Sequence, residues 1–197
     1  MRYCLKFVLN NGKEGADAVL SRKALSRRCN LYIAAIFARG MCYDKGKSSE
    51  HYSGGVFMTI TATKSWKNYL ALCNVLERND IIYDRDDRHL SVGCRISGKD
   101  CEYCFRFSVE PSKMLITLCV PVPRWFPQEQ ARNTALRICK INNDLTDGSF
   151  CYDPALGLVY YKMTASFYES RIGEELYEYM LSVAADAMDE YYQKLLI

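Results

Sequence analysis

Residues 89–120 read HLSVGCRISGKDCEYCFRFSVEPSKMLITLCV, and this stretch decides the fold. Apolar and polar residues alternate through His89–Ile96 and again through Cys101–Val109, which is the period of strands with one buried face. Residues 113–120 are apolar on both faces, as in a more deeply buried strand. Short turns at 97–100 and 110–112 separate the three runs. The stretch therefore predicts a three-stranded antiparallel meander.

The sequence on either side of the meander has helical spacing. Residues 66–76 carry apolar side chains at the helical period, and Ser65 is the expected N-cap of this first helix. Pro121 and Pro123 are expected to end the third strand, since proline has no N–H to donate to a ladder. A second helix is predicted to begin at Pro127 and to end near Asp144.

The last part of the chain predicts a hairpin and a long helix. Strands at 149–153 and 158–165 flank a loop, residues 153–157, that contains Asp, Pro and Gly in turn-forming positions. Residues 172–195 are helical in period, and Glu174 and Glu175 lie in the first turn, where the helix dipole favours negative charge. The predicted fold class is therefore α+β, in the order helix, three-stranded meander, helix, β-hairpin, long C-terminal helix.

Composition and charge divide the chain into two regions. The chain has 197 residues, 49% apolar and 25% charged, which is typical of a globular domain with a real core. Residues 1–63 carry ten Lys and Arg against four Asp and Glu, whereas residues 64–197 carry sixteen against nineteen. We therefore expect a basic, weakly structured N-terminal extension at 1–63 and an α+β domain at 64–197. A further hypothesis places the native start at Met58, because codons for Gly54 and Gly55 can form a ribosome-binding purine run.

The ten cysteines are scattered at irregular spacing, unlike the dense pattern of a secreted disulfide scaffold. They predict reduced thiols in a cytoplasmic protein. No apolar run approaches the roughly 20 residues that span a bilayer. Residues 31–38 follow several basic residues as in a signal peptide, but they are short, lie deep in the chain and are followed at once by Arg39. We therefore expect no membrane partner.

Several short motifs point to a known family. The last helix is acidic and rich in tyrosine, and the other motifs are Val122-Pro123, Ile141-Asn142-Asn143, Gly148-Ser149-Phe150, Asp153 and Gly157. Together they resemble the YbjN-like family of bacterial sensory-transduction regulators, over about residues 66–197. That family is similar in fold to the class I chaperones of type III secretion, which are dimeric α+β proteins with a curved antiparallel sheet. The resemblance implies a bacterial homodimer that holds another polypeptide, and it supplies no catalytic residues.

Cysteine chemistry is one alternative function. Cys101 and Cys104 form a CxxC motif and Cys94 lies nearby, which suggests a redox or zinc-dependent regulator. Residues three apart on a strand point to opposite faces, so we expect Cys101 to enter the core and Cys104 to face outward. Two thiolates on opposite faces cannot share a metal ion. We therefore predict no metal site and no cofactor.

Catalytic patterns are also weak. Asp84, Asp86 and Asp87 crowd one loop and suggest a cation site or an acid/base pair, but alternation with Arg85 and Arg88 favours a solvated turn. The two histidines cannot be paired with a nucleophile from the sequence, and no phosphate-binding or serine-elbow motif occurs. We therefore expect no enzymatic activity.

Four aromatic residues are the predicted partner-binding site. Trp125 and Phe126 lie in a proline-bounded connection that should be exposed, and Tyr160 and Tyr161 should point to opposite faces of one strand. The preferred function is a non-enzymatic, protein-binding or chaperone-like regulator that engages a client or a second copy of itself. Nucleic-acid binding is a third alternative, and it would use the basic residues of the N-terminal region: Arg22, Lys23, Arg27 and Arg28.

Overall fold

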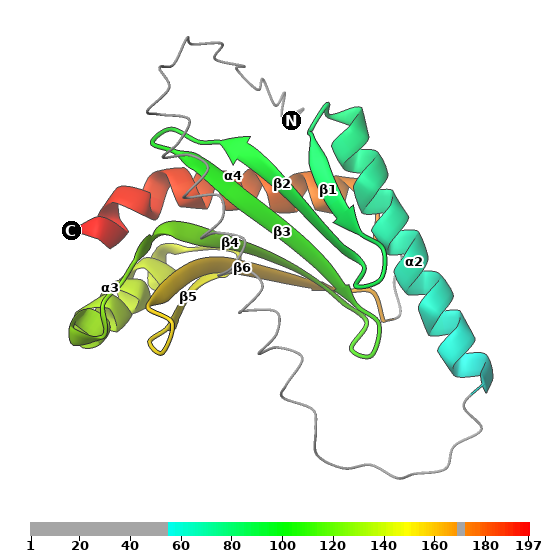
Figure 1. Cartoon of the computed structure of the whole chain (residues 1–197), viewed down its shortest axis with the longest axis horizontal. Coiled ribbons are helices and arrows are strands. Elements are labelled where there is room, and N and C mark those ends of the chain that lie inside the picture. The colour runs from blue at the N-terminus through cyan, green and yellow to red at the C-terminus, as the bar shows by residue number, and fades with distance from the viewer. Residues whose placement is uncertain (1–54, 169–171) are drawn as a thin grey trace. The chain divides into compact units, whose positions relative to one another are not determined.

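The computed structural model describes residues 55–168 and 172–197, with side chains described from residue 63 onward. Residues 1–54 of the predicted N-terminal extension, with its basic cluster, lie outside the described residues, whereas residues 55–63 form the first part of α2. The elements are α2 (Gly55–Arg78), β1 (Tyr83–Asp86), β2 (Ser91–Ser97), β3 (Glu102–Glu110), β4 (Leu115–Trp125), η2 (Gln128–Gln130), α3 (Ala131–Asp144), β5 (Ser149–Asp153), β6 (Leu158–Ser166) and α4 (Glu174–Leu196) (Figure 1). The fold class is therefore α+β. None of these helices has the length and apolar character needed to cross a membrane.

The strands form one six-stranded antiparallel sheet in the order β1-β2-β3-β4-β6-β5. β2, β3 and β4 are the predicted meander, and β5 and β6 are the predicted hairpin. The hairpin joins the meander through β4 and β6, where Leu118 lies opposite Met163. The edge strand β1 is not predicted from the sequence, because it reads YDRD and has no apolar alternation.

One face of the sheet carries the core. Val92, Phe107, Leu118 and Met163 lie opposite one another on successive strands, and all are buried. They pack in one cluster with the buried side chains of α2, α3 and α4, and α4 passes behind the strands in Figure 1. The alternate residues of each strand point to the opposite face, against which no helix of the described residues packs. We call this second surface the helix-free face.

The first helix is longer than predicted. α2 begins at Gly55, so Ser65 lies within the helix and is buried, and it is not an N-cap. Residues 59–64 contain neither Gly nor Pro, so nothing in them ends a helix before Ser65. Serine is a good N-cap only at the start of a helix, and Ser65 lies inside a continuous one. Its capping chemistry therefore does not mark a helix start here.

The third predicted strand also continues beyond its expected end. Phe167 donates its N–H to the carbonyl of Met114 at 2.9 Å. Because hydrogen-bonded positions alternate along an antiparallel ladder, the main-chain groups of even-numbered residues of β4 bond to β6. The main-chain groups of odd-numbered residues point toward β3. Pro121 and Pro123 are odd-numbered, and pairing with β3 stops at Cys119. β4 continues beside β6 to Trp125, with a shift in register after Pro121. The prolines therefore end one ladder and leave the strand intact.

Candidate functional site

The four predicted aromatic residues fall into two groups. Trp125 is 58% exposed, and Tyr160 is half-buried on the helix-free face. Phe126 is 3% exposed and Tyr161 is fully buried, both within the core cluster. This corrects the expectation that Phe126 is an exposed loop residue. β4 extends to Trp125, so Phe126 turns inward, and its N–H donates to the carbonyl of Gly157 at 2.8 Å.

The accessible aromatic residues share a face with several polar side chains. Strand pairing places Cys151 opposite Tyr160 and Ser149 opposite Lys162, and paired residues lie on the same face. Thr164 is two residues beyond Lys162 on β6 and therefore lies on that face as well. Trp125 is paired with Leu158, which lies two residues before Tyr160 on β6, so Trp125 is on the same face as Tyr160. We call these residues the exposed strip: Trp125, Ser149, Cys151, Tyr160, Lys162 and Thr164.

The position of Trp125 depends on the turn between β5 and β6. Gly157 has φ +62°, and a Cβ atom there would lie 2.3 Å from the indole nitrogen of Trp125. Only glycine allows the indole to pack this closely on the turn. Asp153 fixes the same turn, since its carboxylate accepts hydrogen bonds from the N–H groups of Ala155 and Leu156 at 2.9 and 3.1 Å. The exposed indole is thus held on a rigid support.

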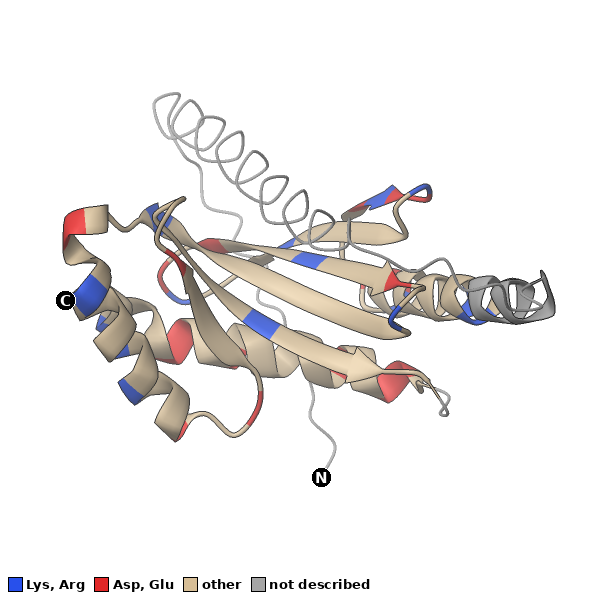
Figure 2. Ribbon diagram, turned by 90° about the horizontal axis from the view of Figure 1, so that it is seen from below, with Lys and Arg blue, Asp and Glu red and all other residues tan. Residues whose placement is uncertain are grey.

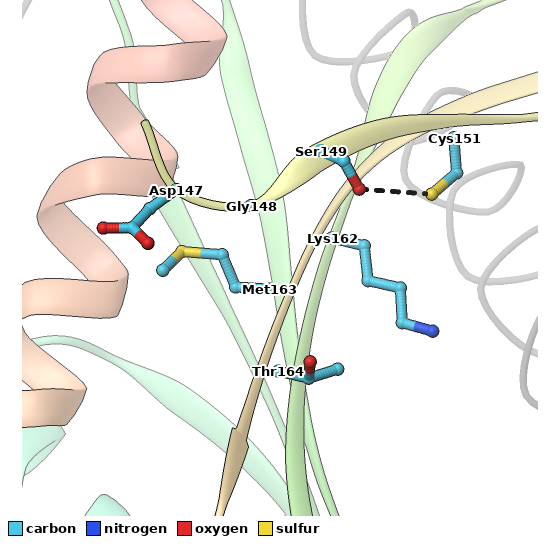
Figure 3. Close-up of a pocket in the computed structure, with 7 residues that line it drawn as sticks. All are labelled: Asp147, Gly148, Ser149, Cys151, Lys162, Met163 and Thr164. Atoms are coloured by element: carbon cyan, nitrogen blue, oxygen red, sulfur yellow. Dashed lines mark hydrogen bonds between the residues drawn. The ribbon is translucent and has the colours of Figure 1, made fainter. Parts of the chain in front are cut away.

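A hollow of about 460 Å³ lies at the other end of the strip. It is lined by Asp147, Gly148, Ser149, Cys151, Lys162, Met163 and Thr164, and we call it the Lys162 hollow. Ser149, Cys151, Lys162 and Thr164 project to one side of the strands, whereas Asp147 and Met163 point to the other side (Figure 3). The hydroxyl of Ser149 and the thiol of Cys151 are 3.8 Å apart. The open side of the hollow therefore carries one cation and three polar groups.

The wall of the hollow is fixed by hydrogen bonds to Asp147. The Tyr161 hydroxyl donates to the main-chain carbonyl of Asp147 at 2.7 Å, and the Tyr179 hydroxyl donates to its carboxylate. Burial raises the pKa of Tyr161 to about 12, so its hydroxyl keeps its proton at neutral pH. Gly148 has φ +70°, and a Cβ atom there would lie 2.2 Å from the Tyr161 oxygen. The main chain can lie against the hairpin only because this residue is glycine.

The two cations near the centre of the helix-free face differ in their partners. Arg106 lies 3.6 Å from the carboxylate of Asp84 and donates to the hydroxyl of Ser91 at 3.4 Å. Gly93 lies between them, and a Cβ atom there would be 2.9 Å from the Asp84 carboxylate, so glycine leaves room for this contact. Among the described residues, no carboxylate lies within ion-pairing distance of Lys162. Lys162 is therefore the cation available to a partner.

The outer edge of the sheet at β5 is closed by a side chain. The Asn142 amide group donates to the carbonyl of Phe150 at 3.0 Å, and the Asn142 carbonyl oxygen accepts from the N–H of Phe150 at 2.8 Å. Asn142 thus occupies the position that a neighbouring strand would take. From the sequence this asparagine is visible only as part of a family motif, because its contact with Phe150 depends on how α3 packs against β5.

The cysteines of the alternative thiol site do not come together. Cys94 and Cys101 contact the core, whereas Cys104 lies opposite Arg95 on the helix-free face. Because Cys101 and Cys104 are on opposite faces, their thiols do not converge, as alternation predicts. Burial raises the pKa of Cys94 to about 12, and it also raises the pKa of Cys101. These thiols are protonated at neutral pH and are weak nucleophiles.

The acidic loop is occupied by internal contacts. Asp84 is the ion-pair partner of Arg106, and Asp87 accepts a hydrogen bond from Tyr69 at 2.8 Å. Asp86 lies 2.7 Å from the ring nitrogen Nδ1 of His89 and accepts from the N–H groups of Arg88 and His89. The hydrogen bond with the His89 side chain is the main cause that lowers the pKa of Asp86. Each carboxylate therefore stabilises the turn or the sheet. Lys and Arg are interspersed with Asp and Glu over the described elements (Figure 2).

Comparisons with known proteins agree with this geometry. No protein with curated annotation matches the chain. A solved structure titled "Crystal Structure of the ExsC-ExsE Complex" is similar over 66% of this chain and 95% of the matched chain, with 13% identity and a TM-score of 0.51. At that identity the likeness concerns the fold alone, and it confirms the predicted type III secretion chaperone-like fold. The profile of the YbjN family, described as "Putative bacterial sensory transduction regulator", matches residues 70–196, so this chain belongs to the YbjN family.

Proposed function

We propose that this protein is a non-enzymatic regulator that holds another polypeptide against the exposed strip. The observation that carries the proposal is the 58% exposure of Trp125, whose indole packs against the β5–β6 turn at one end of a strip that has an uncompensated cation at its other end. Large exposed aromatic side chains on a rigid support are typical anchors of protein interfaces. Family membership and the likeness to a protein taken from a complex, ExsC with ExsE, support a protein-binding role.

The edges of the sheet favour binding on the face. β1 is four residues long and reads YDRD, so a strand that joins it meets charged side chains. At the other edge, Asn142 already bonds to both main-chain groups of Phe150. A polypeptide that lies across the helix-free face displaces neither feature. Side chains that point down from an extended segment can meet Trp125 and Tyr160.

A second copy of the chain is the other partner that this strip fits. An interface between two copies would bury Trp125 from both, because a two-fold axis brings the same patch of each copy together. This arrangement would form the homodimer that the sequence resemblance implies. Its affinity would depend on the same aromatic side chains, so one substitution tests both kinds of partner.

The experiment is cross-linking and capture from the native host. A photo-reactive aromatic amino acid at position 125, which keeps a ring in the place of the indole, should give a cross-linked polypeptide. In a separate affinity capture, Trp125→Ala should reduce recovery of the same polypeptide at least tenfold. Leu136→Ala is the matched control, since Leu136 is 55% exposed on α3 and lies outside the strip. Equal capture by wild type and Trp125→Ala would contradict the proposal. A cross-linked product that contains only this chain would identify the partner as a second copy.

A further inference from the structure

The Lys162 hollow differs chemically from the aromatic end of the strip. Lys162 lies on the central part of β6, between Cys119 on β4 and Ser149 on β5. Its ammonium group extends to the same side as the polar atoms of Ser149, Cys151 and Thr164 (Figure 3). The ammonium group, the two hydroxyls and the thiol can all donate hydrogen bonds. A ligand that accepts hydrogen bonds and carries negative charge fits this set.

The acidic residue of the hollow does not neutralise Lys162. Asp147 points away from Lys162, and its carboxylate accepts a hydrogen bond from Tyr179. Arg106, the neighbouring cation on the helix-free face, already has Asp84 as its partner. Asp84 therefore supplies negative charge to Arg106, whereas Lys162 is left for a ligand.

We propose that the Lys162 hollow binds a glutamate or aspartate side chain of an extended polypeptide whose next residues lie along the strip toward Tyr160 and Trp125. This inference rests on the proposed function, because it names the chemistry of the segment that the strip holds. A carboxylate bound to an ammonium group and a hydroxyl forms charge-assisted hydrogen bonds, which are about twice as strong as neutral ones. The pairing with Ser149 sets these donors on adjacent strands of one sheet.

A free carboxylate would use only part of this surface. Tyr160 lies opposite Cys151, which lines the hollow, so the aromatic part of the strip begins next to it. Successive side chains on one side of an extended segment are two residues apart, which matches the spacing of Tyr160 and Lys162 along β6. An acidic residue followed two positions later by an apolar residue is therefore the favoured pattern. A polypeptide gains from both contacts, whereas a small dicarboxylate gains from one.

The test is binding of a labelled synthetic peptide that repeats Glu-Ser-Val-Ser, in which a valine follows each glutamate by two positions, measured by fluorescence anisotropy with the full chain. Lys162→Gln should weaken binding at least tenfold, or about 1.4 kcal/mol. The peptide with glutamine in place of glutamate should bind wild type and Lys162→Gln equally weakly. Lys140→Gln is the matched control, since it removes an exposed lysine on α3, and it should change the affinity less than twofold. Unchanged thermal unfolding of each variant shows that the fold is intact.

Three results would overturn the inference. The first is no binding of the glutamate peptide to wild type, and the second is equal binding by wild type and Lys162→Gln. The third is displacement of the peptide by free glutarate at the concentration at which the glutamate peptide itself competes, because the hollow would then be a site for small carboxylates. Capture of a polypeptide through Trp125 together with any of these results would leave the proposed function standing and remove only the acidic specificity.

Discussion

The two faces of the sheet are built from alternate residues of the same strands, and they have different tasks. Phe107 and Leu118 enter the core, whereas their neighbours Arg106 and Thr117 point to the helix-free face. The core face is aromatic and aliphatic, and its side chains pack against three helices. The helix-free face is mixed, with hydroxyl, thiol, cationic and carboxylate groups, and with Trp125 and Tyr160 at one end. The helices pack on the core face, whereas the accessible recognition groups lie at the β5–β6 end of the other face, whose centre is also buried at Ser108, Thr117 and Cys119.

The largest effect should come from emptying the core face. Phe107→Ala removes a fully buried ring from the centre of the sheet and should lower the free energy of unfolding by about 3–5 kcal/mol. Thr164→Ala is the matched change on the exposed strip and should stay within about 0.5 kcal/mol. Urea unfolding monitored by circular dichroism measures both. Comparable losses for the two variants would show that the faces do not divide stability in this way.

A smaller effect is expected at the β5 edge of the sheet. Asn142→Ala leaves the N–H and carbonyl groups of Phe150 without partners and should cost about 1–3 kcal/mol. The opened edge should also pair with other chains, so the apparent mass in light scattering should rise with concentration. Asn143→Ala changes the exposed neighbour and should do neither. A monodisperse Asn142→Ala variant of unchanged stability would assign edge protection to another part of the molecule.

The fold was largely predictable because its signals are local. Alternation in residues 89–109 sets which side chains of β2 and β3 are buried, and the structure confirms this at Val92 and Phe107. The opposite placement of Tyr160 and Tyr161 was predictable for the same reason. Errors arose where a local signal has two meanings: Ser65 can cap a helix or lie inside one, and proline can end a strand or only one of its ladders.

The site was less predictable because it depends on contacts between distant segments. Phe126 is buried since β4 continues to Trp125, and that extension depends on pairing with β6, more than thirty residues later. The Lys162 hollow needs the Tyr161 hydroxyl, Gly148 and Asp147 together, from strand β6 and from the loop before β5. Asn142 acts on Phe150 only once α3 is packed. None of these relations is present in a single stretch of sequence.

The thiols provide a comparison of the two faces at alkaline pH. Cys94 lies in the core and Cys119 on the other side of the sheet, and burial raises the pKa of both from 9.0 to about 12. Between about pH 9 and 12 the unfolded chain loses these protons while the folded chain keeps them, so stability falls as pH rises. Each thiol contributes a slope of about 1.4 kcal/mol per pH unit. Cys94→Ala and Cys119→Ala should each reduce the measured slope by that amount.

Urea unfolding over this pH range gives the slopes directly, and the slope is informative even if the substitution itself changes stability. A Cys119→Ala variant with the slope of wild type would mean that this thiol titrates normally and is open to water. The two faces would then differ more, because the helix-free face would be hydrated at its centre as well as along the strip, whereas the core face would be dry.

The smallest effect concerns the ion pair on the helix-free face. Asp84→Asn removes the partner of Arg106, but the Asp84 side chain is 81% exposed, and exposed ion pairs contribute less than about 1 kcal/mol. Stability should therefore change little, and the change should vanish in high salt. Binding of the glutamate peptide should tighten, because Arg106, which is separated from Lys162 by Cys119 on β4, becomes a second uncompensated cation on this face. If Asp84→Asn instead destabilises the fold by more than about 2 kcal/mol, the ion pair of Asp84 and Arg106 stabilises the fold. Stability and recognition would then not be divided between the two faces of the sheet.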